Sequence, residues 1–243
     1  EAVCSVSEPI VLLLNNDVKL APGCVDRLAE TFERHADCFL ASPLCWTFDG
    51  RYEGTRSALR FRLGLVHTEL APAEDVRGQR SEVRGQGSYT ASAGAVLAVS
   101  RERFLGLSGF DPLFLPGRFE DLDLAFRAWL AGWRAYYVPE AVAYHKGSAT
   151  FGARFNRRAA AELDARNALL FAWKNLREPR HMAIHLAFLM LRLARALATG
   201  ETIFLRGWAG ALRRLPQVFE RRAAATPRVR SERELFDMLG GAA

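Results

Sequence analysis

Short apolar runs alternate with segments of helical periodicity along most of this chain. The run Ile10–Leu14 ends in the polar triplet Asn15-Asn16-Asp17 and predicts a buried parallel strand. After Pro22-Gly23, apolar side chains recur at helical spacing. Further strands are expected at residues 39–42, 45–48, 95–100, 134–138 and 142–144, and helices at 101–106, 120–131 and 156–175. The alternation favours an α/β sheet with functional side chains at the strand ends.

Composition narrows the classes of protein that need to be considered. Half of the 243 residues are apolar and a quarter are charged, which is typical of globular proteins and argues against disordered, collagenous and disulfide-scaffold chains. The four cysteines (Cys4, Cys24, Cys38 and Cys45) form no C-x-x-C pair, so they argue against a structural zinc site and fit a reducing compartment. Residues 51–86 are polar and weakly periodic and predict an irregular excursion.

The charge distribution divides the chain into two parts. Residues 177–233 hold 12 arginines and four glutamates, whereas basic and acidic side chains balance over residues 1–176. We therefore expect a globular part at 1–176 and a basic amphipathic helical tail at 177–243, with a polar, frayed stretch at 221–233. The tail is compatible with an interfacial anchor on an anionic membrane or with helices packed on the globular part.

No membrane-spanning segment or signal peptide is expected. The most apolar window, residues 182–191, contains His185 and ends before Arg192, whereas a span needs about 20 apolar residues. The first nine residues lack the basic start and apolar run of a signal peptide.

Three positions carry side chains suited to chemistry. Asp17, at the carboxyl end of a strand, can bind a divalent cation that bridges a diphosphate, although Asn and Asp also favour plain turns. The segment Glu120-Asp121-Leu122-Asp123 places three carboxylates at a helix start, where they either cap the helix or supply a general base. His145 follows a strand and is either a structural residue or a metal ligand, with Lys146 beside it to face phosphate oxygens.

Together these motifs resemble the inverting glycosyltransferase family 2 of the GT-A type, including bacterial rhamnosyltransferases and galactofuranosyltransferases. The segments that carry the resemblance are LLLNNDV at 12–18 with Pro22-Gly23, ASAGA at 91–95, Gly109-Phe110-Asp111, EDLDL at 120–124 with Arg127 and Gly132, Tyr137-Val138-Pro139 with His145, and Arg166-Asn167 with Phe171 and Lys174-Asn175. The resemblance covers residues 10–175 in order and spacing.

The resemblance implies a Rossmann-like mixed sheet flanked by helices, incomplete at its N-terminus, since the family's segment for the nucleotide base and ribose would precede residue 1. It also implies a role for each matching position. Asp17 and His145 would hold Mg²⁺ or Mn²⁺, with Asn15 in place of the family's variable first acid, and Asp121 would deprotonate the acceptor hydroxyl. The positions that would contact substrates are Glu120, Gly94, Ala95 and Lys146.

The implied function is transfer of a sugar from a nucleotide-diphosphate-sugar to a cell-envelope glycan or lipid-linked acceptor. The implied location is cytoplasmic and peripheral on the inner face of the membrane. A non-catalytic, membrane-associated transferase remnant is the alternative. A nucleic-acid binder is disfavoured, because the tail arginines flank apolar helices and no basic sheet carries stacking aromatics.

Overall fold

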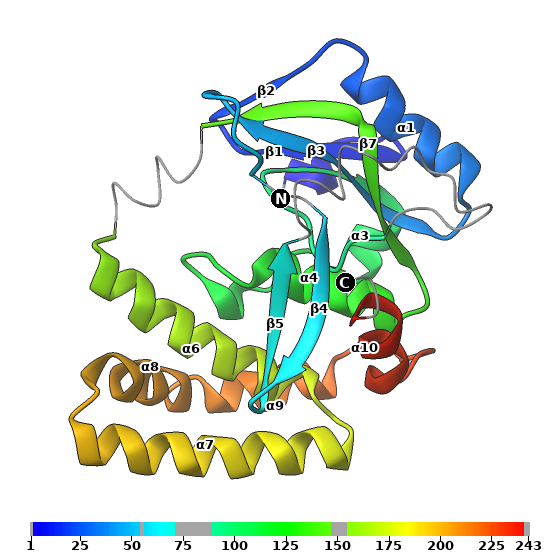
Figure 1. Ribbon diagram of the computed structural model, residues 1–243. Helices are drawn as coiled ribbons and strands as arrows, with labels where there is room; N and C mark the ends of the chain where they lie inside the picture. Colours follow the sequence, from blue (N-terminus) through cyan, green and yellow to red (C-terminus); the bar gives the residue numbers. More distant parts are fainter. Residues whose placement is uncertain (1, 54–55, 71–88, 147–154, 241–243) are drawn as a thin grey trace.

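The computed structural model describes residues 2–53, 56–70, 89–146 and 155–240. Its centre is a five-stranded mixed sheet in the order β1-β6-β3-β7-β2 (Figure 1). The strands are β1 (Ile10–Leu14), β2 (Val18–Leu20), β3 (Cys38–Thr47), β6 (Val96–Ser100) and β7 (Arg134–His145). The mixed α/β class expected from the sequence is confirmed.

Helices cover both faces of the sheet and create two apolar clusters. One face packs on α1 (Cys24–Arg34) through Leu28, Ala41 and Val96. The other face packs on α4 (Glu120–Leu130) and α6 (Arg157–Asn175), with Trp129 and Phe171 fully buried. The short elements are η1 (Ala2–Ser5) and α3 (Arg101–Gly106), which contact each other, and η2 (Pro112–Phe114), which contacts α6.

The first strand differs from the expectation. β1 pairs antiparallel with β6, lies at an edge of the described sheet, and is only half-buried. The prediction of a buried parallel strand is therefore wrong for the described residues. An apolar run indicates that a strand is partly buried. Whether the strand pairs parallel or antiparallel depends on how the chain connects it to its neighbour in the sheet.

Two pairs of expected strands are each one strand. β3 unites 39–42 with 45–48, and β7 unites 134–138 with 142–144. The two strands run parallel, and their register jumps from Pro43–Val138 to Leu44–Val142. Residues 139–141 form a bulge there, so Pro139 interrupts the pairing without ending the strand.

Residues 57–70 form a regular hairpin rather than the expected irregular excursion. β4 (Ser57–Arg62) pairs antiparallel with β5 (Leu65–Leu70). Leu63 and Gly64 both have positive φ, which is typical of a two-residue hairpin turn. Residues 71–86 of that expected excursion, together with 54 and 55, lie outside the described residues.

The C-terminal helices pack back onto the sheet domain. α8 (Thr202–Leu212) lies against α6, and α10 (Glu232–Gly240) lies against β4. α7 (Pro179–Thr199) crosses the base of Figure 1, with α9 (Leu215–Ala223) following α8. Of the tail's two open interpretations, packing on the globular part is therefore observed.

The stretch at 221–233 is fixed rather than frayed, because its arginines bind backbone carbonyls. Arg222 donates to Trp173 and Leu176, Arg228 donates to Asn175, and Arg230 donates to Trp129, Gly132 and Trp133. These carbonyls lie at or just beyond the ends of α4 and α6, where helices leave acceptors unpaired.

Glu178, His181 and Glu232 form a buried junction between α7 and α10. Glu232 accepts from the backbone N–H groups of Arg177 and Glu178, while Glu178 accepts from those of Glu232 and Arg233. His181 Nδ1 lies 2.9 Å from Glu232 Oε2. Glu178 thus caps the first N–H groups of α10, and Glu232 holds the two residues that lead into α7, so the cluster has a structural role.

Candidate active site

Asp17 and His145, 128 residues apart, meet at the edge of the sheet. β2 pairs with the end of β7 so that Val18 lies opposite His145, and the Lys146 N–H donates to the Asp17 carbonyl at 3.1 Å. His145 Nε2 lies 3.0 Å from Asp17 Oδ1. Its Nδ1 lies 2.9 Å from Glu53 Oε1. The sheet therefore holds one imidazole between two carboxylates.

This arrangement fits a divalent cation. When Nδ1 donates to Glu53, Nε2 presents its lone pair beside Asp17 Oδ1. Adjacent ligands in an octahedral Mg²⁺ shell lie about 3 Å apart, given bonds of about 2.1 Å, and the Nε2–Oδ1 separation is 3.0 Å. Glu53 was not predicted from the sequence, because a single carboxylate in a polar stretch carries no local signal.

A cavity of about 790 Å³ opens between the ends of β1 and β6 and the loop that precedes α4. Asn15, Gly94, Ala95, Glu120 and Asp121 all line it. The Asn15 N–H donates to the Ala95 carbonyl at 2.9 Å. This hydrogen bond joins the Asn15-Asn16-Asp17 triplet to the segment of small residues at 91–95. The structure thus brings together five of the eight predicted site residues around one hollow.

The other three predicted residues lie apart from this lining. Asp17 is two residues from Asn15 but does not line the cavity. It lies instead next to His145 at the edge of the sheet. Lys146 is exposed and lines neither of the two cavities described here.

The loop before α4 is held in an unusual conformation. Arg118 and Phe119 have φ values of 71° and 73°, a left-handed region that side chains disfavour. Asn167 Nδ2 donates to the carbonyls of Phe114, Gly117 and Arg118 at 2.8–3.2 Å. Arg166 also donates, to the Leu115 carbonyl. The Arg166-Asn167 pair of α6 therefore shapes the wall of the cavity.

The three carboxylates at the start of α4 have separate environments. Asp123 is completely buried and accepts from Arg127, Lys174 and Asn175. Lys174 also pairs with Asp111 at 2.6 Å. Asp123 therefore belongs to a structural ion cluster, and Glu120 and Asp121 remain for the cavity.

Asp121 and Glu120 combine partial burial with few partners. Burial raises the pKa of Asp121, while hydrogen bonds from the Leu122 N–H and the Ser92 hydroxyl lower it. Burial also raises the pKa of Glu120, and the Asp121 charge adds to this effect. Glu120 Oε2 is buried and finds no hydrogen-bond partner among the described residues. A carboxylate with a raised pKa is a better proton acceptor, and an unpaired buried oxygen is suited to a ligand hydroxyl.

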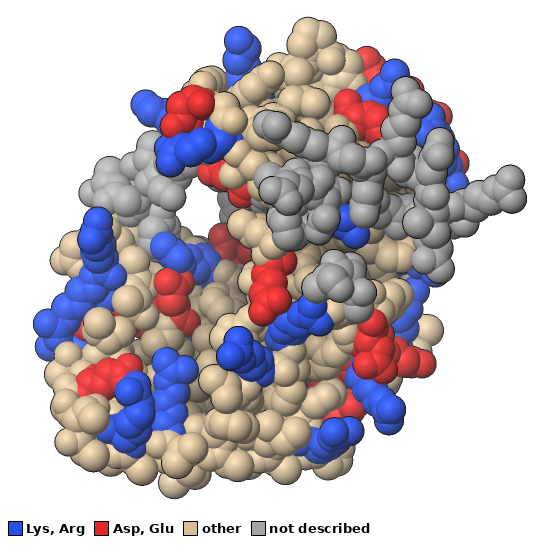
Figure 2. All heavy atoms as spheres, viewed as in Figure 1, with Lys and Arg blue, Asp and Glu red and all other residues tan. Residues whose placement is uncertain are grey.

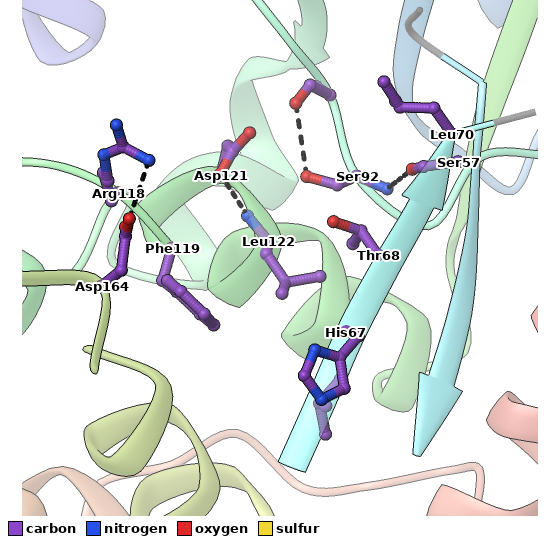
Figure 3. A pocket seen from close by; sticks show the side chains of 12 residues that line it. Ser57, His67, Thr68, Leu70, Ser92, Arg118, Phe119, Asp121, Leu122 and Asp164 are labelled. Carbon is purple, nitrogen blue, oxygen red and sulfur yellow. Dashed lines mark hydrogen bonds and ion pairs between the residues drawn. The ribbon is translucent and has the colours of Figure 1, made fainter. Parts of the chain in front are cut away.

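A second cavity of about 440 Å³ adjoins Asp121 from the side of the hairpin (Figure 3). β5 contributes His67 and Thr68, and the Arg118–Asp164 ion pair lies across from them. Asp121 lines both cavities, so a group held in either one can reach the same carboxylate.

The fold and the paired cavities define an α/β protein in which carboxylates at the start of α4 line two adjoining cavities. The model of the family described as "Glycosyltransferase like family 2" matches residues 1–161, and the chain belongs to this family.

Two curated relatives are similar over part of the chain. An N-acetylglucosaminyl-diphospho-decaprenol L-rhamnosyltransferase of Mycobacterium tuberculosis is 32% identical over 149 residues, which are 58% of this chain and 48% of that protein. An uncharacterized protein, y4gI, of Sinorhizobium fredii is 28% identical over 154 residues, or 62% of this chain and 17% of its own length. The chain therefore spans about half the length of the rhamnosyltransferase.

Two solved structures are also similar. GalNAc-T7 with UDP, GalNAc and Mn²⁺ gives a TM-score of 0.48 at 12% identity, over 82% of this chain and 44% of that one. The mannosyltransferase PcManGT of Pyrobaculum calidifontis, in complex with GDP-Man and Mn²⁺, gives 0.41 at 16% identity, over 91% and 64%.

Proposed function

We propose that this protein transfers a sugar from a nucleotide-diphosphate-sugar to a hydroxyl of a cell-envelope glycan or lipid-linked acceptor, with inversion. Membership of family 2 supports transfer of a sugar, and the similarity to a rhamnosyltransferase makes L-rhamnose the first donor sugar to test. The observation that carries the proposal is the position of Asp121 in the lining of both cavities.

The larger cavity suits the donor sugar. Gly94 and Ala95 leave room for a sugar ring close to the backbone, and Glu120 Oε2 offers an unused acceptor for a sugar hydroxyl. Glu120 lines this cavity and not the hairpin cavity, so we assign it to the donor sugar.

The hairpin cavity suits the acceptor. A hydroxyl placed there next to Asp121 gives its proton to the carboxylate as its oxygen bonds to the anomeric carbon, and the bond from that carbon to the diphosphate oxygen breaks. Attack from the face opposite the diphosphate gives inversion. The raised pKa of Asp121 makes the carboxylate more basic and favours this proton transfer.

Asp17 and His145 would hold Mg²⁺ or Mn²⁺, oriented by Glu53. The cation would neutralise charge on the departing nucleoside diphosphate. The exposed ammonium of Lys146, on the residue after His145, would reach the diphosphate from the solvent side. An acceptor linked to a membrane lipid would place the enzyme on the inner face of the cell membrane.

The test is sugar transfer from nucleotide-activated L-rhamnose to a prenyl-diphosphate-linked N-acetylglucosamine, measured for the wild type and for Asp121→Asn. We expect Asp121→Asn to lower kcat by about 10²–10⁴-fold, the usual contribution of a general base, with little change in donor affinity. The matched control is Asp26→Asn, which removes an exposed acid from the first turn of α1. A wild-type rate in Asp121→Asn would overturn the assignment. Donor binding without transfer to any acceptor would favour the non-catalytic remnant.

A further inference from the structure

The helix α7 is turned with its apolar side toward solvent. Its exposed side chains include Leu186, Met190, Leu191 and Leu197, which are 49%, 65%, 67% and 69% exposed. Four alanines on the same side, at positions 183, 187, 194 and 198, are exposed as well. We call these eight residues the α7 outer face. Nothing in the described part of the chain covers this face. A continuous exposed apolar surface of this kind is unfavourable in water and typically marks an interaction site.

The two histidines of α7 face the protein instead. His185 is buried, donates from Nδ1 to the Gly64 carbonyl at 2.7 Å, and accepts from Trp173 Nε1 at 2.9 Å. Burial lowers the pKa of His185, in keeping with a neutral ring. His181 binds Glu232, and the Arg192 guanidinium stacks on Phe204. The orientation of the helix is thus fixed by specific polar contacts, and the outer face is a consequence of them.

We propose that the α7 outer face inserts into the interfacial region of an anionic phospholipid bilayer, with the helix axis in the membrane plane. Charge supports this occupant. The segment 179–200 contains no Asp or Glu, and the three arginines of α7 itself, Arg180, Arg192 and Arg195, are exposed and supply its cationic rim. Figure 2 shows the base of the molecule, where α7 runs, as mostly uncharged, with Lys and Arg side chains and some Asp and Glu side chains just above it. An apolar face with a cationic rim is typical of interfacial helices.

The same features argue against a second copy of the chain as the occupant. A two-fold interface through α7 would place the arginine rim of one copy against that of the other, and like charges there are costly. An anionic lipid surface complements the rim instead.

The contacts of α7 also argue against α7 as a membrane-spanning helix. By length and composition, α7 is the one helix among the described residues that could cross a membrane, although the sequence analysis expected none. A crossing would break the bonds of His181 and His185 and strip α7 from its contacts with α8. In-plane docking keeps all of these contacts.

The hairpin relates this face to the acceptor cavity, a step that rests on the proposed function. Its tip, Leu63 and Gly64, lies on α7, and β5 runs from there to the cavity wall at His67 and Thr68. At about 3.3 Å per residue, Thr68 lies about 13 Å along the strand from Gly64. A sugar attached through a diphosphate to a membrane lipid would be presented near this height above the docking helix.

Flotation with vesicles tests the docking without any measurement of transfer. The protein is mixed with vesicles of phosphatidylglycerol and phosphatidylcholine at 0.1 M and 0.5 M NaCl. We expect the wild type to float, with weaker but persistent binding at high salt, because apolar insertion is not screened. The variant Leu186→Gln/Met190→Gln/Leu197→Gln is expected to bind at least tenfold more weakly at both salt concentrations.

The matched control is Val25→Gln, an exposed apolar residue of α1, which is expected to float like the wild type. Circular dichroism and thermal melting of each variant confirm that it folds. Equal flotation of the triple variant and the wild type would overturn the inference. So would concentration-dependent dimerisation without lipid binding, if the triple variant abolished it, because that result assigns the face to a second copy.

Spin labels test the in-plane orientation. Nitroxides are attached at Leu186→Cys and Leu197→Cys on a Cys4→Ser background, since Cys4 is the exposed free cysteine. The two positions are about 16 Å apart along the helix axis. Equal immersion depths by power saturation support docking in the plane, whereas depths that differ by more than about half this separation contradict it.

Discussion

At the scale of single residues, Asp121 depends on the groups that surround its carboxylate. Burial raises its pKa, and the Ser92 hydroxyl opposes that shift by hydrogen bonding to the charged form. From the residues alone, the acids of the Glu120–Asp123 segment were either helix caps or a general base. The tertiary contacts separate Asp121, which lines both cavities, from Asp123, which is held by Arg127, Lys174 and Asn175.

We therefore predict that Ser92→Ala moves the acidic limb of the kcat profile to higher pH. Removal of the hydroxyl destabilises the carboxylate, so the pKa of Asp121 rises further and the base is protonated, and inactive, at a higher pH. Transfer rates measured between pH 4 and 8 test this, with the exposed Ser5→Ala as the control. A limb that stays in place or moves to lower pH would contradict the prediction.

Glu53 is expected to act as a positioning residue for His145. Its carboxylate fixes the tautomer that leaves Nε2 free for a metal, and loss of such a partner typically lowers metal affinity 10–100-fold. We predict weaker Mn²⁺ binding for Glu53→Ala, and a smaller loss for Glu53→Gln, which keeps an acceptor for Nδ1–H. Titration of Mn²⁺ followed by electron paramagnetic resonance measures this without turnover. Glu33→Gln, a change at the exposed side of α1, is the control, and wild-type affinity in Glu53→Ala would refute the role.

At the scale of elements, helices were more predictable than strands. The expected helices at 101–106, 120–131 and 156–175 match α3, α4 and α6 within one residue at each end. The hairpin was missed, although Leu59 and Phe61 alternate with Arg60 and Arg62 and Gly64 marks a turn. Arginines on the polar side obscured that period, and the hairpin is supported by contacts far along the chain, of Gly64 with α7 and of β4 with α10.

Gly64→Ala tests that packing. A Cβ at this position would lie 2.9 Å from His185 Cα and 3.0 Å from Phe188 Cβ, at a φ of +75°. We predict a loss of about 2–5 kcal/mol in the free energy of unfolding, from backbone strain and overpacking together. Gly50→Ala, at a φ of +81° with open space around it, isolates the strain and is expected to cost only about 1–2 kcal/mol. Urea unfolding measures both, and equal losses would show that the contact with α7 contributes nothing.

At the scale of the whole molecule, the boundary expected at residue 176 is crossed by one apolar core. Leu170 and Phe171 share a cluster with Phe204, Val218 and Leu235 from the basic tail. The division into two parts follows a change in charge along the sequence, and it remains a prediction about how the chain is organised. Because the two parts share one apolar core, neither part can unfold without exposing apolar side chains of the other.

We predict that both parts unfold in a single transition. Circular dichroism and tryptophan fluorescence should give coincident urea curves, as expected for a cooperative unit. Truncation after Leu176 should abolish cooperative unfolding, because it exposes residues that α8, α9 and α10 cover. Two separated transitions in the intact chain, or a truncated chain that melts cooperatively, would show that the parts are independent.

The sequence by itself determined the α/β class, the family and the identity of most candidate site residues. These signals depend only on residues close together along the chain, as strand and helix periodicity and short motifs do. Only the tertiary structure decided that Glu53 joins His145, that Asp121 lines two cavities, that β1 runs antiparallel to β6, and that α7 turns its apolar side outward. These features depend on contacts between residues far apart along the chain, and periodicity shows that a helix has two faces without showing which one the fold will cover.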